Sequence, residues 1–273
     1  MAQASVDILL GSVLAAMDNF GSLPLFPLFD WAHFTLMVID LRNDAGSGAN
    51  ALSKNHPLVC WFCAMLSCFA GAIFVNFLLG QPLLYFFNNH VRVGLATVVW
   101  YLVFYCPGDL YYKTMTTLPA KVGLVPLKEV IRARKVAKGV VQAADMYPEG
   151  YLIMIIIGTI QGTGSMLMRN VERLLRGVFD KAGNELMKPS FALKAYALNS
   201  CLMVLQREGL LGIPFSHLLL YITIAMATIK ISMLLFHLPD PFSYVEATIR
   251  PLLFGKPISA AAEEEKKEKA KAE

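Results

Sequence analysis

Long apolar segments recur along the whole chain, and they constrain its fold more than any other feature. Several of these segments approach the ~20 residues that a helix needs to cross a bilayer. The 273 residues are 56% hydrophobic and 16% charged, whereas a soluble domain has roughly 25% charged residues. Because the apolar runs are continuous rather than alternating, they disfavour a membrane barrel. The sequence therefore predicts an all-α polytopic membrane protein.

Seven transmembrane segments can be traced through the apolar runs. The first is expected to be interrupted near its middle by Gly21, Pro24 and Pro27, a break that is tolerated where protein surrounds it. The predicted segments cover residues 5–41, 57–79, 93–112, 118–144, 151–175, 191–205 and 214–235. Polar loops are expected at residues 42–56, 81–91 and 176–190, and a charged, disordered tail at 259–273 after one transmembrane domain of residues 1–258.

The first six segments divide into two units of three, at about residues 5–113 and 118–206, followed by a seventh helix at about 214–236. Each unit carries a glycine-bearing helix in second place, with Gly71 in the first unit and a glycine cluster in the second. Three spans per unit place successive units in opposite orientations. Such inverted repeats are typical of transport proteins, whose sites lie near the membrane midplane at the repeat interface.

Basic residues between the predicted spans indicate the orientation. Seven spans place the two termini on opposite sides of the membrane. One side holds only Arg207, with Arg92 at a boundary. The other side, which includes the C-terminal tail, holds Arg42, Lys54, Lys113, Lys121, Arg173, Arg176, Lys181, Lys188, Arg250, Lys256 and the tail lysines. By the positive-inside rule, the C-terminus is cytosolic and the N-terminus lies across the membrane.

The stretch from Lys128 to Lys135 carries five charges in eight residues, although it lies inside the predicted fourth span. Lys128, Arg132 and Lys135 follow the spacing of one helix face. Ionisable groups at membrane depth usually face a protein interior or a wet pathway. This face is therefore a candidate site for anionic groups such as lipid phosphates at the cytosolic side of a pore. Snorkelling of the longer side chains, or an internal ion pair of Glu129, is the alternative.

The fifth span contains a second candidate group. Gly158, Gly162 and Gly164 permit close helix approach, and with Gly71 they form the glycine positions where a helix packs closely or kinks. Hydroxyl and basic side chains on the same span are possible pore or lipid contacts, namely Thr159, Thr163, Ser165 and Arg169. Close packing alone and packing combined with pore lining both remain open.

Catalytic and metal-binding motifs are not found in the sequence. It contains no GxSxG, Walker or HExxH pattern. Cys60 and Cys63 have CxxC spacing, but no second Cys or His pair lies near enough to complete a zinc site, so they are expected to be buried apolar residues. The sequence therefore predicts neither an enzyme nor a resident metal or cofactor.

Several blocks of sequence, in a fixed order, resemble the trimeric intracellular cation (TRIC) channel family. The blocks are HPLVCWFCAML (56–66), LLGQPLLYF (78–86), WYLVFYCPGDLYYK (100–113), KEVIRARKVAKG (128–139), NVERLLRG (170–177) and PFSYVEATIRPLLFG (241–255). The blocks at 100–113 and 128–139 are the most specific. Together the resemblance covers most of residues 24–255.

The resemblance implies a homotrimeric potassium channel of the endoplasmic or sarcoplasmic reticulum, with one pore per protomer. It would supply counter-ion current during calcium release and uptake, and its N-terminus would be lumenal. The phosphoinositide-binding lysine and arginine of the family match Lys128 and Arg132, so phosphatidylinositol bisphosphate is the implied bound lipid. Gly71 stands without the adjacent glycine that the family's second-helix motif has.

A pore lined by basic residues should repel cations, which conflicts with the conduction of cations. Bound lipid phosphates could reverse the local field, as could Glu129 and backbone carbonyls. Two other functions remain as alternatives. A secondary transporter of a small solute could also be built on inverted repeats, and a non-conducting membrane adaptor could dock partners through its basic loops.

Overall fold

The computed structural model describes residues 11–12, 15, 17–175, 177 and 189–254. It divides into two compact units, residues 1–231 and 232–273. Among the described residues every regular element is a helix, so the predicted all-α class is confirmed. Most of the predicted helix at residues 5–20, most of the predicted loop at 176–190 and the whole predicted tail lie outside the described residues.

Most helices of the described part of the chain follow one another with short connections. The α-helices are α2 (Leu28–Ala45), α3 (Ala49–Asn55), α4 (Pro57–Leu78), α5 (His90–Tyr105), α6 (Leu110–Thr116), α7 (Leu118–Met146), α8 (Tyr151–Leu175), α9 (Phe191–Arg207), α10 (Phe215–Phe236) and α11 (Pro241–Phe254). The residues that the structure describes also form short 3-10 helices, namely η1 (Phe20–Ser22), η2 (Gly46–Gly48), η3 (Leu83–Asn88) and η4 (Pro107–Asp109). No helix at 241–254 had been predicted from the sequence.

Local sequence signals explain where several helices begin and end. The side chain of Asn89 caps α5 by accepting a hydrogen bond from the Arg92 amide at 3.1 Å. The Ser190 hydroxyl caps α9 by accepting one from the Leu193 amide at 3.4 Å. Gly46 ends α2 with a φ of 54°, a conformation that a side chain would disfavour.

The helix in the predicted third span is bent after Tyr105. The span was expected at residues 93–112, but α5 ends at Tyr105 and the axis turns by 92° between His90–Tyr105 and Pro107–Thr116. Pro107 cannot donate the amide hydrogen bond that would continue the helix. Gly108 and Asp109 follow with φ angles of 65° and 58°, which no α-helix contains.

The polar segment at residues 42–56 is also more ordered than predicted. It was expected to be a loop, but α2 continues to Ala45 and α3 occupies Ala49–Asn55. Two of its small residues, Ala49 and Ser53, are buried. Burial of one face stabilises a short helix whose composition alone is polar, because packing contributes more to helix stability than propensity does.

Length and composition support fewer spans than were predicted. Within the described part of the chain, α4, α8 and α10 are long and apolar enough to cross a membrane, and the bent pair of α5 with η4 and α6 is a fourth candidate. Helix α7 is long enough, but it carries the charged stretch. These helices support a polytopic membrane protein.

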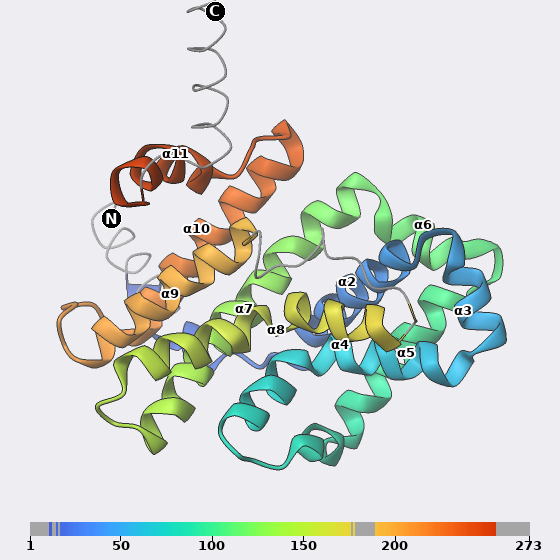
Figure 1. The fold of residues 1–273 in the computed structure, drawn as a ribbon, viewed down its shortest axis with the longest axis horizontal. Coiled ribbons are helices and arrows are strands. Elements are labelled where there is room, and N and C mark those ends of the chain that lie inside the picture. Colours follow the sequence, from blue (N-terminus) through green and yellow to red (C-terminus); the bar gives the residue numbers. More distant parts are fainter. Residues whose placement is uncertain (1–10, 13–14, 16, 176, 178–188, 255–273) are drawn as a thin grey trace, which may run out of the picture. The chain divides into compact units, whose positions relative to one another are not determined.

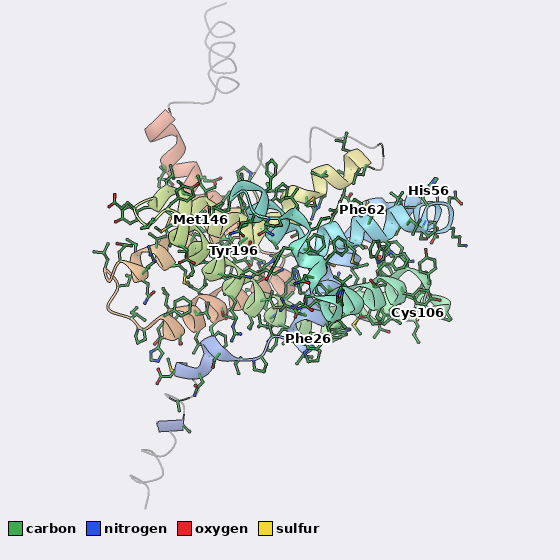
Figure 2. All side chains as sticks on the ribbon, turned by 90° about the horizontal axis from the view of Figure 1, so that it is seen from below. Phe26, His56, Phe62, Cys106, Met146 and Tyr196 are labelled. Atoms are coloured by element: carbon green, nitrogen blue, oxygen red, sulfur yellow. The ribbon has the colours of Figure 1, made fainter. Side chains whose placement is uncertain are left out.

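Helices α4, α7 and α8 lie side by side in the first unit (Figure 1). Helix α8 packs against α4, α7 and α9, while α2 packs against α4, α5 and α7. Figure 2 shows His56, at the start of α4, and Cys106, just after α5, toward one end of this unit, and Met146, at the end of α7, toward the other. An apolar core joins α2, α4 and α5, where Val38, Cys63 and Val99 are fully buried.

The glycines of the predicted second helices meet where α4 crosses α8. A Cβ atom added to Gly164 would lie 2.6 Å from the Cα of Gly71, and one added to Gly71 would overlap the carbonyl of Gln161. Gly158 faces Ser200, and Gly162 faces a methyl group of Val136. Side chains at these positions would collide with neighbouring helices, so the glycines allow the close approach. Helix α4 passes Gly71 without a break.

Candidate functional site

A polar cavity of about 110 Å³ lies between α2, α4, α7 and α8. Three basic and three acidic residues share it with smaller and apolar ones. Its lining consists of Met37, Asp40, Leu41, Asp44, Ser67, Lys128, Arg132, Ser165, Met166, Arg169 and Glu172. Ionisable groups inside a membrane protein are costly and usually mark a substrate or ion pathway. This cavity is therefore the candidate functional site.

Lys128 and Arg132 contribute the basic wall of the cavity from successive turns of α7. Their exposed fractions are only 9% and 4%. The Lys128 ammonium lies 3.5 Å from a carboxylate oxygen of Asp40, whose side chain is 46% exposed. This long, solvated ion pair holds Lys128 weakly. The Arg132 guanidinium lies 4.0 Å from Glu129, beyond hydrogen-bond distance, and it stands over the Tyr196 ring at 5.5 Å.

The acidic groups of the cavity come from α2 and α8. The guanidinium of Arg173 binds Asp44 through two nitrogens, with distances of 2.5 and 3.1 Å to the same carboxylate oxygen. The hydroxyl of Ser67 on α4 donates a hydrogen bond to Glu172. These contacts hold α2 and α4 to the end of α8 where the cavity lies. The cavity therefore presents both signs of charge within a small volume.

Glu129 lies outside the cavity lining, although it is next to Lys128 in the sequence. It is 1% exposed. The Tyr196 hydroxyl donates a hydrogen bond to one of its carboxylate oxygens, and the Lys230 ammonium lies 2.6 Å from the other. The sequence proposed Glu129 as a possible pore or lipid contact, whereas the structure places it between α9 and α10.

Lys135 also lies outside the cavity lining. Its ammonium is 2.8 Å from the Nε2 atom of His33, whose ring is also 3.2 Å from the Cys68 carbonyl oxygen. The face predicted from Lys128, Arg132 and Lys135 therefore divides in the structure. Two of its members meet at the cavity, and the third lies one helical turn beyond Arg132, beside α2.

The candidate residues of α8 divide in the same way. Ser165 and Arg169 line the cavity. Thr159 and Thr163 do not, because each hydroxyl donates a 2.7 Å hydrogen bond to the carbonyl four residues earlier in its own helix. Both threonines are buried.

Several cavity residues were not predicted from the sequence as site residues, namely Asp40, Asp44, Ser67 and Glu172. Asp40 and Asp44 are four residues apart, which places them on one face of a helix. This spacing could have indicated a shared face, but the polar composition of residues 42–56 predicted a loop at residue 44. Tyr196 and Lys230 were not predicted as site residues either.

The cavity contains no evident metal-binding group. Among the described residues, no cluster of three or more His, Cys, Asp or Glu side chains is arranged to hold a metal ion. Each acid of the cavity instead has a basic or hydroxyl partner, as Asp40 has Lys128 and Glu172 has Ser67. The arrangement suits temporary pairing of a cation or a phosphate with fixed charges of opposite sign.

Comparisons with known proteins agree with this geometry. The sequence model of the TRIC channel family matches residues 46–237. A trimeric intracellular cation channel type 1B.1 from Caenorhabditis elegans is 42% identical over 245 residues, which cover 89% of this chain and 83% of the relative. The human trimeric intracellular cation channel type A is 40% identical over 238 residues, 87% of this chain and 79% of the relative.

Solved structures show the same likeness. A trimeric intracellular cation channel from C. elegans with bound Ca²⁺ matches with a TM-score of 0.76 and 42% identity, covering 82% of this chain and 97% of that one. A structure described as explaining the activity of TRIC counter-ion channels in calcium release matches with a TM-score of 0.77 and 34% identity, covering 82% and 99%. These relatives are ion channels rather than enzymes. The extent of the match shows that this chain belongs to the TRIC channel family.

Proposed function

We propose that this protein conducts monovalent cations, chiefly potassium, across the endoplasmic or sarcoplasmic reticulum membrane. The current would balance the charge that moves during calcium release and uptake. Membership of the TRIC family supports conduction of cations. The description of one similar structure as a counter-ion channel in calcium release supports the physiological context.

The observation that carries the proposal is the charged cavity beside α7. An apolar helical protein places Asp40, Asp44 and Glu172 together with Lys128, Arg132 and Arg169 around one small volume. Acidic groups in such a cavity attract cations, and the basic groups hold an anion beside them. A cavity of both signs can therefore pass cations while it keeps a bound phosphate.

Lys128 and Arg132 bind the phosphate groups of a phosphoinositide in this proposal. Arginine can bind phosphate through two parallel hydrogen bonds, and lysine adds a point charge. The weak pairing of Lys128 with Asp40 supports the proposal, because a strongly paired lysine would have to break a contact first. Ser165 and Arg169, which line the same cavity, contribute further polar contacts to the phosphate or to the ion.

The assembly is proposed to be a homotrimer with seven spans per protomer. The names of the similar proteins describe trimeric channels. The crossing of α4 and α8 at Gly71 and Gly164 supports two inverted units of three helices, because it joins the second helix of each unit. The positive-inside rule then places the C-terminus in the cytosol and the N-terminus in the lumen.

Single-channel recording tests the proposed conduction. Purified protein in planar bilayers should give discrete openings in potassium chloride and in sodium chloride, with a reversal potential that follows the cation gradient. Saturable solute uptake without discrete openings would indicate a transporter instead. Protein that inserts but carries neither current nor solute would indicate an adaptor.

The lipid part of the proposal needs its own measurement. The protein should bind more tightly to vesicles that contain phosphatidylinositol 4,5-bisphosphate than to vesicles without it. The double substitution Lys128→Ala and Arg132→Ala should lower this affinity about tenfold or more. Lys138→Ala is the matched control, since Lys138 is an exposed lysine of the same helix. Normal phosphoinositide binding by the double variant would contradict the site.

A further inference from the structure

A cluster of ionisable side chains lies behind the cavity, on the side of α7 that faces α9 and α10. We call Glu129, Tyr196 and Lys230 the inner cluster. The Lys230 ammonium lies 2.6 Å from Glu129 and 3.0 Å from the Tyr196 hydroxyl, which itself donates to Glu129. Tyr196 is fully buried, and its label in Figure 2 lies within the outline of the packed helices. The proposed conduction pathway uses none of these three residues directly.

The inner cluster determines which acid Arg132 can reach. Arg132 is one of the basic residues that line the cavity, and Glu129 is its neighbour one helical turn earlier. Both side chains are almost fully buried, where opposite charges attract strongly. Even so, the guanidinium stays 4.0 Å from the carboxylate. The two carboxylate oxygens of Glu129 are directed instead to Lys230 and Tyr196.

The Arg132 guanidinium also has an aromatic partner in the same cluster. It stands over the Tyr196 ring at 5.5 Å, and the Lys230 ammonium lies 5.0 Å from the same ring. A cation over an aromatic face keeps its hydrogen-bond donors available at the edge of the guanidinium. Tyr196 therefore contacts Arg132 through its ring, while its hydroxyl donates to Glu129.

We propose that Tyr196 and Lys230 are positioning residues of the cavity, because they hold Glu129 away from Arg132 and so leave Arg132 free to bind an anionic phosphate group. This inference rests on the proposed function, in which Lys128 and Arg132 hold phosphate. It assigns a role in that site to α9 and α10, neither of which contributes a residue to the cavity lining.

Removal of the Lys230 charge has a defined consequence. In Lys230→Met, Glu129 keeps Tyr196 but loses its ammonium partner, and Arg132 is the nearest remaining cation. The carboxylate then pairs with the guanidinium and withdraws it from the cavity. The expected result is a loss of about tenfold in affinity for phosphoinositide vesicles.

A double variant separates this role from a merely structural one. In Lys230→Met combined with Glu129→Gln, both charges of the inner pair are gone, so no carboxylate competes for Arg132. Phosphate affinity should return to within about threefold of the wild-type value. A purely structural role predicts that affinity falls and recovers together with trimer stability, because Lys230→Met leaves the buried Glu129 charge uncompensated and Glu129→Gln relieves it. The positioning role predicts the same loss and recovery of affinity in protein that elutes as a trimer throughout.

The binding experiment uses the full-length protein, with trimer elution on size exclusion as the folding check. Two probes distinguish the source of the phosphate, namely vesicles that contain phosphatidylinositol 4,5-bisphosphate and soluble inositol 1,4,5-trisphosphate. Lys138→Met, the same substitution at an exposed lysine of α7, is the control and should bind as the wild type does. Should Lys230→Met fail to fold, Tyr196→Phe removes only the hydroxyl that holds Glu129, and about threefold lower affinity is expected.

Potassium current in vesicles without phosphoinositide gives a second readout that does not depend on lipid binding. Pairing of Arg132 with Glu129 makes the cavity less positive, so Lys230→Met should raise the current on the order of twofold, and the double variant should restore it. Failure of the wild type to bind either phosphate probe would remove the lipid part of the proposed function, and the current would then decide the inference. Unchanged affinity and current in Lys230→Met and Tyr196→Phe, or no recovery in the double variant, would overturn it.

Discussion

Lys128 and Glu129 are adjacent on α7, yet they lie in two different electrostatic environments. Lys128 lines the cavity and has one long ion pair to Asp40, whose side chain is 46% exposed. Glu129 faces away from the cavity and has two short contacts, to Tyr196 and to Lys230 at 2.6 Å. One side of the helix is thus open and weakly paired, and the other is closed and fully paired.

The difference shows how a single helix can carry both a binding site and its support. A charge that has to bind a mobile ion or phosphate cannot already be saturated by fixed partners. The ion pair of Lys128 is long and its Asp40 partner is 46% exposed, so it should contribute little, about 0–1 kcal/mol, and give way easily. A buried network contributes rigidity instead, because loss of one partner leaves the other charge without compensation.

The crossing of α4 and α8 is a second closely packed region beside the cavity. Gly71 and Gly164 bring the two backbones together without side chains between them. Ser165, which follows Gly164, already lines the cavity. The boundary between the closely packed contact and the polar cavity therefore falls within one residue of α8, and substitutions on either side of it should have different effects.

The largest effect on stability is expected from Glu129→Ala. It leaves the Lys230 ammonium and the Tyr196 hydroxyl buried without their acceptor, which should cost about 3–5 kcal/mol in the free energy of unfolding. Denaturant unfolding of the detergent-solubilised protein measures the loss. Asp40→Ala is the comparison on the open side. Equal losses for both variants would show that the two faces of α7 do not differ.

Gly164→Ala should have the next largest effect. Its methyl group would meet the backbone of Gly71 at 2.6 Å, so α4 and α8 have to separate, at a cost of about 1–3 kcal/mol. Gly123→Ala is the matched control, because a Cβ there has no neighbour within 4 Å. The control should be neutral or stabilising by up to about 1 kcal/mol, since alanine favours a helix more than glycine does. The apparent melting temperature of the trimer reports both, and a stable Gly164→Ala would argue against the close crossing.

Asp44→Asn is expected to have an intermediate effect. Arg173 binds this carboxylate through two nitrogens at the rim of the cavity, and a neutral amide cannot accept both hydrogen bonds equally well. The expected loss is about 1–2 kcal/mol in unfolding free energy. Asp145→Asn, at an exposed acid near the end of α7, should change stability much less. The same denaturant experiment compares them, and identical midpoints would mean that the Asp44 pair contributes nothing.

Asp40→Asn should have the smallest effect on stability and a visible effect on binding. Its pair with Lys128 is long and solvated, so the unfolding free energy should change by less than about 1 kcal/mol. Lys128 would then lose the carboxylate of Asp40 as a competitor, and affinity for phosphoinositide vesicles should rise about threefold. Vesicle co-sedimentation measures that change. A fall in affinity would show that Asp40 helps to position Lys128 rather than to compete for it.

Much of the helical architecture could be predicted from the sequence. Continuous apolar runs and a charged helix face are local patterns, which can be recognised from the periodicity of the sequence. The predicted segment at 118–144 became α7 (Leu118–Met146), and the segment at 191–205 became α9 (Phe191–Arg207). The bend after Tyr105 was missed, although Pro107 and Gly108 signalled a break in the helix.

The site was predicted only in part. Lys128, Arg132, Ser165 and Arg169 do meet at one cavity, as their helix faces allowed. Glu129 and Lys135 share the same charged stretch but point to other neighbours. The acids that complete the cavity were not recognised, because Asp44 lies in a segment whose polar composition resembled a loop.

The sequence by itself determined that this chain is a helical membrane protein and that one helix carries basic residues on successive turns. Only the tertiary structure decided which partner each charge has. Asp40 and Lys128 are 88 residues apart, and Glu129 and Lys230 are 101 apart. Periodicity describes the faces of one helix, but the register between distant helices depends on how their surfaces pack. For that reason two adjacent residues of α7 came to lie on the open and the closed side of the same site.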